Sequence, residues 1–239
     1  MLETRKRFHE ELNALESEIL GLGERAELAL SRAVDGLVRK DGTLSEQVIA
    51  DDDAIDATYM DVERRILGLL ATQTPVASDL RLVSAIMHIN LHLERVGDMA
   101  VNIAKMSLVT MDLPASETVL SHLEEMGAVA GTMLRTAIDS FARRDLDLAQ
   151  RLPQMDDPID LLNRNMYREV AALASDPLML EWGLRMNVVS RQLERVGDHA
   201  VDIGEQVAFL LTGEFREFTD ASHPEITATG SGGTGSGGP

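Results

Sequence analysis

The sequence contains no cysteine, and this absence removes several classes of chemistry at once. Disulfide frameworks, zinc-thiolate sites, iron–sulfur clusters and thiol nucleophiles are all excluded, so any metal must bind to oxygen or imidazole. Aromatic residues make up 3% of the chain, and there are seven prolines. This composition argues against an aromatic-rich β-sandwich and suits helices packed through aliphatic residues and methionine.

Long apolar runs and basic clusters are also scarce. The first residues include a basic cluster but no apolar signal core, and no apolar run approaches the length of a bilayer span. We therefore expect a soluble, cytoplasmic protein. The net charge of −18 argues against direct binding of nucleic acid, because phosphate contacts need clustered Lys and Arg. Cations or basic protein surfaces are better partners for such a chain.

What the sequence does contain is an internal repeat. The segment LERVGDMAVNI at 93–103 recurs as LERVGDHAVDI at 193–203, with nine identities in eleven positions. Similar elements precede each copy, so the repeat unit is about half of the chain. We predict two halves, 1–112 and 113–216. A Gly/Ser-rich tail over 217–239 is expected to be disordered, because its few apolar groups cannot offset the entropy of ordering.

Each half is expected to hold three long helices. Apolar periodicity, prolines and capping residues place them at about 5–39, 44–71 and 80–111, then 116–143, 146–173 and 178–211. Gly42 is expected to take a left-handed position after the first helix. Either Ser78 or Asp79 is expected to cap the third helix, and Pro158 to kink or restart the fifth. The predicted fold is all-α, with two tandem, internally duplicated three-helix bundles.

The third helix of each half carries a row of oxygen-bearing side chains in addition to its apolar stripe. The two rows are Glu94, Asp98 and Asn102, and Glu194, Asp198 and Asp202. A helical wheel places both rows opposite the core stripe, on a bundle surface, where carboxylates four residues apart repel each other unless a cation offsets them. Gly97 and Gly197 inside the motifs predict close approach of a neighbouring helix. An acid row is ordinarily solvated surface, but its duplication favours a functional role.

The second helix of each half adds a pair of acids at the same spacing of four residues. These pairs are Asp52 with Asp56, and Asp156 with Asp160. Four carboxylates from two neighbouring helices make a hard, anionic oxygen site, suited by ligand type to Mg, Mn, Ca or oxidised iron. The sequence does not select among these ions.

The paired E/D-x-x-x-D motifs, the segment ASDLRLV after Pro75 and the doubled LERVGD resemble the PhoU family over about residues 3–216. The resemblance implies two similar three-helix bundles side by side that bind divalent or trivalent metal ions, such as Mg, Mn, Fe or Zn, through these motifs. Carried over by position, the first site would use Asp52, Asp56, Glu94 and Asp98, and the second Asp156, Asp160, Glu194 and Asp198. Asn102 and Asp202 would be supplementary ligands.

The same resemblance implies a role in phosphate homeostasis. Such a protein would be a negative regulator of the phosphate-starvation response and a modulator of phosphate uptake, not an enzyme. Its partners would be the ATPase subunit of a phosphate ABC transporter and a phosphate-sensing histidine kinase. It would reach the membrane only through these partners, and the resemblance is compatible with a homodimer.

Two other functions are left open. One is a metal-free helical adaptor whose acid faces meet a basic partner surface. The other is a carboxylate-bridged metal enzyme, but di-iron bundles use inward Glu-x-x-His pairs that neither ERVGD motif supplies. The pair His88 and His92 has the spacing to ligate a metal, but helix packing or a surface patch is the expected role. His199 stands next to Asp198 and could make a supporting contact to the metal site, but an ordinary surface residue is expected.

Overall fold

A computed structural model of the chain describes residues 2–215, 217 and 218, with side chains from Lys6 onward. Over these residues the structure has six helices and no strand. The helices are α1 (Leu2–Val38), α2 (Gly42–Thr72), α3 (Ser78–Thr110), α4 (Glu117–Arg143), α5 (Leu146–Ala172) and α6 (Pro177–Thr212). The all-α prediction is confirmed, and the predicted bounds agree with these to within a few residues.

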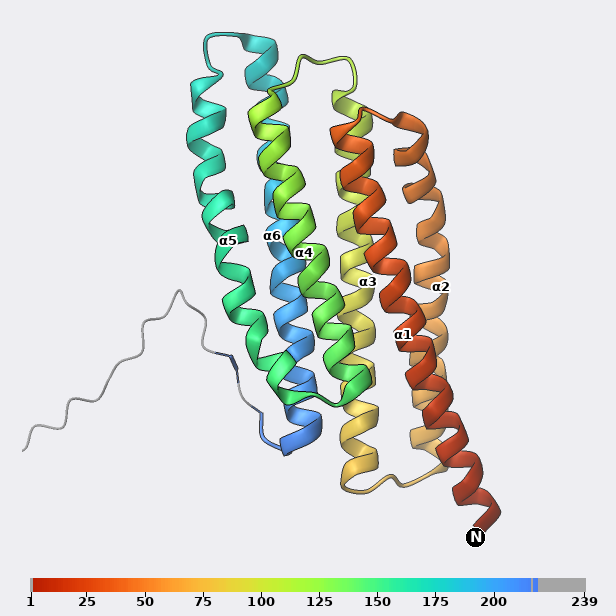
Figure 1. Cartoon of the computed structure of the whole chain (residues 1–239). Coiled ribbons are helices and arrows are strands. Elements are labelled where there is room, and N and C mark those ends of the chain that lie inside the picture. The colour runs from red at the N-terminus through yellow and green to blue at the C-terminus, as the bar shows by residue number, and fades with distance from the viewer. Residues whose placement is uncertain (1, 216, 219–239) are drawn as a thin grey trace, which may run out of the picture.

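The helices form two three-helix bundles that stand side by side (Figure 1). In the first bundle α1, α2 and α3 pack together, and in the second α4, α5 and α6 do so. The bundles meet through α1 against α4 and through α3 against α6. The predicted tandem bundles are therefore confirmed, and α3 and α6 each have helical neighbours on three sides.

Two contacts fix how α3 lies against α6. The guanidinium Nε of Arg81 donates a hydrogen bond to the carbonyl oxygen of Leu210 at 3.2 Å, and the Nδ1 atoms of His92 and His199 lie 3.1 Å apart. From Arg81 to His92 the chain advances eleven residues along α3, whereas their partners, Leu210 and His199, run eleven residues in the opposite direction along α6. The two helices are therefore antiparallel, and the two copies of the repeat face each other across an approximate twofold axis.

One continuous apolar core runs through both bundles and includes residues of all six helices. Leu15, Ile89 and Leu123 are fully buried, and Trp182 is almost so. The alternating spacing of three and four residues explains this, because it places one apolar stripe of each helix toward its neighbours. The two repeats therefore share a core rather than folding around separate ones.

Most helix starts carry a side-chain cap. The side chains of Asp41, Ser116, Asp145 and Asp176 accept hydrogen bonds from amides in the first turns of α2, α4, α5 and α6. The predicted cap of α3 is wrong. Ala77, with φ of 46°, precedes that helix without a side-chain cap, while Asp79 lies in the first turn and there interacts favourably with the helix dipole.

A further local prediction is wrong. Gly42 does not take a left-handed conformation; Lys40 does, with φ of 53°, and Gly42 begins α2. Gly42 lies against the end of the Met111 side chain, and a Cβ atom on it would lie 2.5 Å from Met111 Cε. At Pro158 the fifth helix does not restart, because α5 runs through both of its prolines. The alternative, a kink at Pro158, stays a prediction.

The predicted tail at 217–239 lies outside the described residues, apart from Glu217 and Phe218. Phe218 packs against the core, and its amide donates a hydrogen bond to Oε1 of Glu205 at 2.6 Å. The helices that the structure describes include none long and apolar enough to cross a membrane.

The contact between the repeats can be tested with two glycines one turn apart on α4. A Cβ atom on Gly127 would lie 2.8 Å from Cγ2 of Val34 on α1, whereas one on Gly131 would have open space. Gly131→Ala is expected to raise the free energy of unfolding by up to about 1 kcal/mol through helix propensity. Gly127→Ala is expected to lower it by about 1 to 2 kcal/mol through overpacking. Urea denaturation measures both, and equal effects would contradict the packing described.

Candidate functional site

Each acid cluster lies where two helices approach closely at a glycine. A Cβ atom on Gly97 would lie 3.2 Å from Oδ1 of Asp52, and one on Gly197 would collide with Oδ1 of Asp156. The predicted reason for these two glycines is therefore confirmed. The missing side chain lets a carboxylate of α2 lie over the backbone of α3, and lets a carboxylate of α5 do the same on α6.

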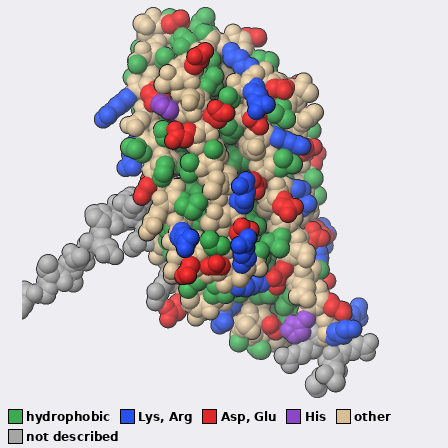
Figure 2. All heavy atoms as spheres, in the orientation of Figure 1, with side chains coloured by type: hydrophobic (Ala, Val, Ile, Leu, Met, Phe, Trp, Pro, Cys, Tyr) green, Lys and Arg blue, Asp and Glu red, His purple; other side chains and the backbone are tan. Residues whose placement is uncertain are grey.

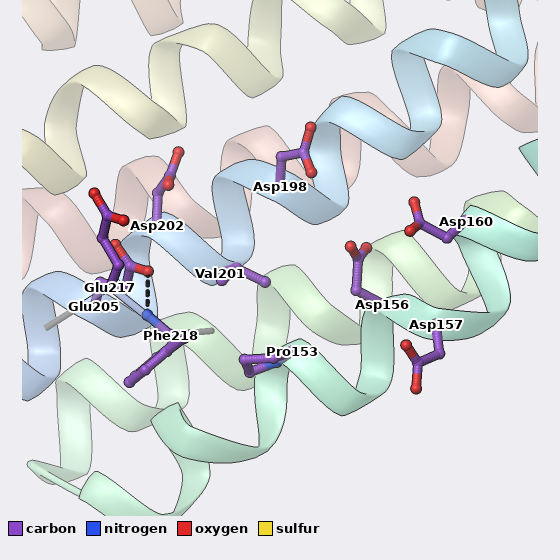
Figure 3. Close-up of a pocket in the computed structure, with 10 residues that line it drawn as sticks. All are labelled: Pro153, Asp156, Asp157, Asp160, Asp198, Val201, Asp202, Glu205, Glu217 and Phe218. Atoms are coloured by element: carbon purple, nitrogen blue, oxygen red, sulfur yellow. Dashed lines mark hydrogen bonds between the residues drawn. The ribbon is translucent and has the colours of Figure 1, made fainter. Parts of the chain in front are cut away.

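The second groove lies between α5 and α6. Asp156 and Asp160 point into the space between the helices, and Asp198 lies across the groove on α6 (Figure 3). The groove has a volume of about 310 Å³ and is also lined by Pro153, Asp157, Val201, Asp202, Glu205, Glu217 and Phe218. Asp156 interacts electrostatically with Asp160, Asp198 and Glu194, so the structure brings together all four predicted acids of the second site.

The first groove, between α2 and α3, repeats this arrangement. Asp52 interacts electrostatically with Asp56 and Asp98, and Glu94 interacts with all three of these aspartates. Arg95 lies at the rim, with Nε 3.6 Å from Glu94 Oε2 and Nη1 3.7 Å from Asp98 Oδ2. The four predicted acids of the first site therefore also share one groove.

The supplementary residues differ between the grooves. Asn102 is exposed on α3, whereas Asp202 is half-buried and lines the second groove. Its Oδ2 atom also lies within 3.5 Å of His92 Nδ1 and 3.4 Å of His199 Nδ1. Asp202 therefore lies between the α5–α6 groove and the α3–α6 contact.

Burial and mutual repulsion change the acidity of both clusters. Burial, followed by the charges of Asp160 and Asp198, raises the pKa of Asp156 to about 7. Burial and Asp198 likewise raise the pKa of Glu194 to about 7, although Arg191 opposes the shift. In the first groove burial and the charge of Asp56 raise the pKa of Asp52 to about 6. These groups therefore hold protons at pH values where an ordinary carboxyl is ionised.

The predicted orientation of the acid rows is wrong in one respect. Glu194 is only 8% exposed, and the side chain of Glu94 is 18% exposed, so neither faces open solvent. The helical wheel treated α3 and α6 as helices with one outward face. Because each has neighbours on three sides, the acid row faces α2 or α5 across a groove.

The donor atoms of both grooves fit a hard cation chemically. Glu94 Oε2, Asp156 Oδ1 and Glu194 Oε2 are buried and have no hydrogen-bond partner. An unpaired buried carboxylate oxygen is costly, and a cation that prefers oxygen ligands would supply the missing partner. However, no three carboxylates in the described part of the chain bring oxygens within 4.8 Å of one another. The acids are spread along each groove rather than gathered around one point.

The charge pattern of the grooves contrasts with the face formed by α1 and α4. On that face acidic side chains lie among Lys and Arg (Figure 2). Arg135, for example, donates a hydrogen bond to Glu27 across the two bundles at 3.0 Å. The negative charges there are partly offset by neighbouring cations, whereas most of the groove acids face one another.

A further cluster, which we call the histidine triad, was missed by sequence reasoning. His92, His199 and Asp202 bring potential ligand atoms within 4.8 Å of one another. His92 and His199 are both half-buried in the α3–α6 contact, so the prediction that His199 is an ordinary surface residue is wrong. The two histidines are 107 residues apart and are not equivalent in the repeat. Only the antiparallel register of α3 and α6 shows that they meet.

Comparison with known proteins gives a consistent result. The PhoU domain family matches residues 19–107 and 123–207, one segment in each half. The "Phosphate-specific transport system accessory protein PhoU homolog" of Caulobacter vibrioides is 32% identical over 212 residues, which cover 88% of this chain and 92% of that protein. The protein of the same description from Clostridium acetobutylicum is 31% identical over 219 residues, covering 91% of this chain and all of the relative.

Solved structures agree with this comparison. The crystal structure of PhoU from Pseudomonas aeruginosa superposes with a TM-score of 0.81 at 32% identity, over 87% of this chain and 100% of that one. The phosphate transport system regulatory protein PhoU from Streptococcus pneumoniae gives a TM-score of 0.80 at 32% identity, over 87% and 99%. The similarity therefore covers both bundles.

The raised pKa values predict how the stability of metal-free protein depends on pH. The folded chain keeps protons on Asp156 and Glu194 up to about pH 7, whereas the unfolded carboxyls release theirs near pH 4. The contribution of these two protonated groups to the free energy of unfolding is therefore fully present below about pH 4 and is lost as the pH rises through about 7. After allowance for solvent screening, we expect a loss of about 1 to 2 kcal/mol between pH 5 and 8.

Thermal denaturation in the presence of a chelator measures this slope. Asp156→Asn should reduce it, and the control Glu125→Gln, which changes an exposed acid on α4, should leave it unchanged. The same slope in all three proteins would show that the groove carboxyls are not the source.

Proposed function

The chain belongs to the PhoU family, and from this premise we propose that it is a regulatory accessory protein of a phosphate-specific transport system. Its relatives carry that description, and the similarity extends over nearly their whole length. In this proposal the chain acts at the cytoplasmic face of the membrane, as a negative regulator of the phosphate-starvation response. It would link the ATPase subunit of the transporter to a phosphate-sensing histidine kinase.

We further propose that both grooves bind metal ions. The ligands would be Asp52, Asp56, Glu94 and Asp98 in the first groove, and Asp156, Asp160, Glu194 and Asp198 in the second. The observation that carries this proposal is the set of buried carboxylate oxygens without a hydrogen-bond partner, namely Glu94 Oε2 in the first groove and Asp156 Oδ1 and Glu194 Oε2 in the second. Oxygen ligands favour Mg, Mn or Fe, and Zn also accepts carboxylates.

The acids would also control when a groove accepts a cation. Asp156 and Glu194 hold protons near neutral pH, so binding of a cation would release these protons. Once ionised, the carboxylates of α5 and α6 would bind the same cation, and the cation would offset the repulsion between them. That would hold α5 against α6 and, in the other bundle, α2 against α3, giving a fixed surface for partners.

The second groove should bind cations more tightly than the first. Asp202 adds a negative charge there, at the position where the first groove has the uncharged Asn102. Glu194 is also more buried than Glu94, which strengthens its interaction with a bound charge.

A metal-free adaptor is the second candidate, and one observation favours it. The carboxylates are spread along each groove and do not converge on one point. Such an acidic surface would be complementary in charge to a basic partner surface, and long-range electrostatic attraction would speed the association of the two. We propose no catalytic role, because the acid rows lack the inward Glu-x-x-His pairs of carboxylate-bridged enzymes.

Elemental analysis separates these two candidates. Purified protein is equilibrated with Mg, Mn, Fe and Zn in turn, beside the double variant Asp98→Ala/Asp198→Ala. We expect at least one metal ion per groove in the wild type and loss of that metal in the variant, because each substitution removes a ligand. The control is Glu125→Gln, which removes an exposed charge on α4 and none from either groove. Absence of metal from every sample would leave the adaptor as the remaining candidate.

Partner binding tests the regulatory role itself. Binding of the chain to a transporter ATPase and to a sensor kinase is measured with metal, with chelator, and with the same double variant. We expect chelation and the double substitution to weaken binding at least tenfold, because both would release the helices that frame the grooves. If a variant that has lost its metal binds both partners as well as the wild type, the metal has no part in docking.

A further inference from the structure

The histidine triad at the contact between the two repeats has the dimensions of a metal site. Its three ligand atoms are His92 Nδ1, His199 Nδ1 and Asp202 Oδ2. The distances between them are 3.1 Å for the nitrogen pair, 3.5 Å from His92 to the carboxylate and 3.4 Å from His199 to the carboxylate. Zinc binds imidazole nitrogen and carboxylate oxygen at about 2.0 to 2.2 Å, so the edges of a tetrahedron around it measure about 3.3 to 3.6 Å.

Hydrogen bonds alone leave this triad poorly satisfied. A neutral imidazole has one N–H and one bare nitrogen, so each Nδ1 either donates or accepts. If both Nδ1 atoms carry protons, the two N–H groups face each other; if neither does, three lone pairs converge. A single proton can serve only some of the three close pairs. A cation at the centre would interact favourably with all three atoms.

The surroundings allow a cation to enter and to be held. The side chains of His92 and His199 are 16% and 17% exposed, whereas that of Asp202 is 43% exposed and opens into the α5–α6 groove. Neutral imidazole is a common metal ligand in proteins, and two imidazole rings meet here.

We propose that His92, His199 and Asp202 form a binding site for one divalent transition-metal ion of the zinc type, with water completing the coordination. Imidazole ligands favour Zn, Co, Ni or Cu, whereas the oxygen-only grooves favour harder ions. The site therefore differs in chemistry from the grooves of the proposed function, and Asp202 is the one residue that it shares with the lining of the second groove. Because one histidine belongs to α3 and the other to α6, a bound ion would tie the first repeat to the second.

The approximate twofold axis predicts how many such sites the chain has. It relates His92 to Gln192 and His199 to Met99, so the equivalent position on the other side of the axis has no imidazole. Met99 is also buried, with 2% exposure. The chain should therefore bind one ion of this type.

Titration with Co²⁺ in excess Mg²⁺ tests the proposal. Four-coordinate Co²⁺ with nitrogen ligands absorbs visible light strongly, whereas six-coordinate Co²⁺ on oxygen absorbs weakly, so the histidine triad gives a signal that the acid grooves do not. We expect strong absorbance that saturates at one equivalent, and displacement of Co²⁺ by Zn²⁺. His92→Gln and His199→Gln should each weaken binding at least tenfold.

Two controls make the result specific. His88→Gln changes a histidine one turn away, whose Nδ1 lies 2.8 Å from the carbonyl oxygen of Ser84, and should leave the titration unchanged. The groove variant Asp98→Ala/Asp198→Ala should keep the strong absorbance even though the proposed groove metals are lost. The two proposals can therefore fail independently.

Weak absorbance in the wild type, or strong absorbance kept by both histidine variants, would overturn the proposal. Circular dichroism first checks that each variant is folded. If a histidine variant is not folded, Asp202→Asn decides the question, because its half-exposed side chain can change without disturbing the core. Unweakened Co²⁺ binding by that variant would equally rule the site out.

Discussion

Close approach of two helices at a glycine determines the rest of the site. Without side chains at Gly97 and Gly197, α2 and α5 lie near enough to α3 and α6 for carboxylates of both helices to share a groove. The apolar core on the other side of these helices keeps them there, although the acids repel each other. Raised pKa values and unpaired buried oxygens are direct results of this constraint.

The two repeats apply the constraint to different degrees. The second groove is the tighter one, because a Cβ on Gly197 would collide with Asp156, while the same atom on Gly97 would only be in close contact with Asp52. The pKa is raised to about 7 for Asp156 and to about 6 for Asp52. Duplication has thus kept the motif while allowing the electrostatics of the two copies to differ.

The sequence was sufficient for the fold because its signals are local. Apolar spacing, prolines and caps such as Asp176 placed six helices, and the doubled motif divided them into two bundles. Local reasoning was wrong where packing decides, as at Ala77 and Lys40, which take positive φ angles without being glycine.

The site could be predicted only in part for the same reason. Spacing of four residues identified the groove acids, but not that Glu194 would be buried, because a helical wheel contains no neighbouring helices. The contact of His92 with His199 depends on the register of α3 against α6. That register is a tertiary property, and no pattern along a single helix contains it.

The antiparallel pairing of α3 and α6 determines which substitutions the two repeats can acquire independently. In a symmetric dimer of identical subunits, every substitution appears on both sides of the axis. Here the two halves are covalently joined, so a residue can change on one side alone. His199 and Met99 occupy matching places and yet differ in chemistry. A fused pair of repeats can therefore keep a symmetric scaffold while giving its two sides different ligands to sense.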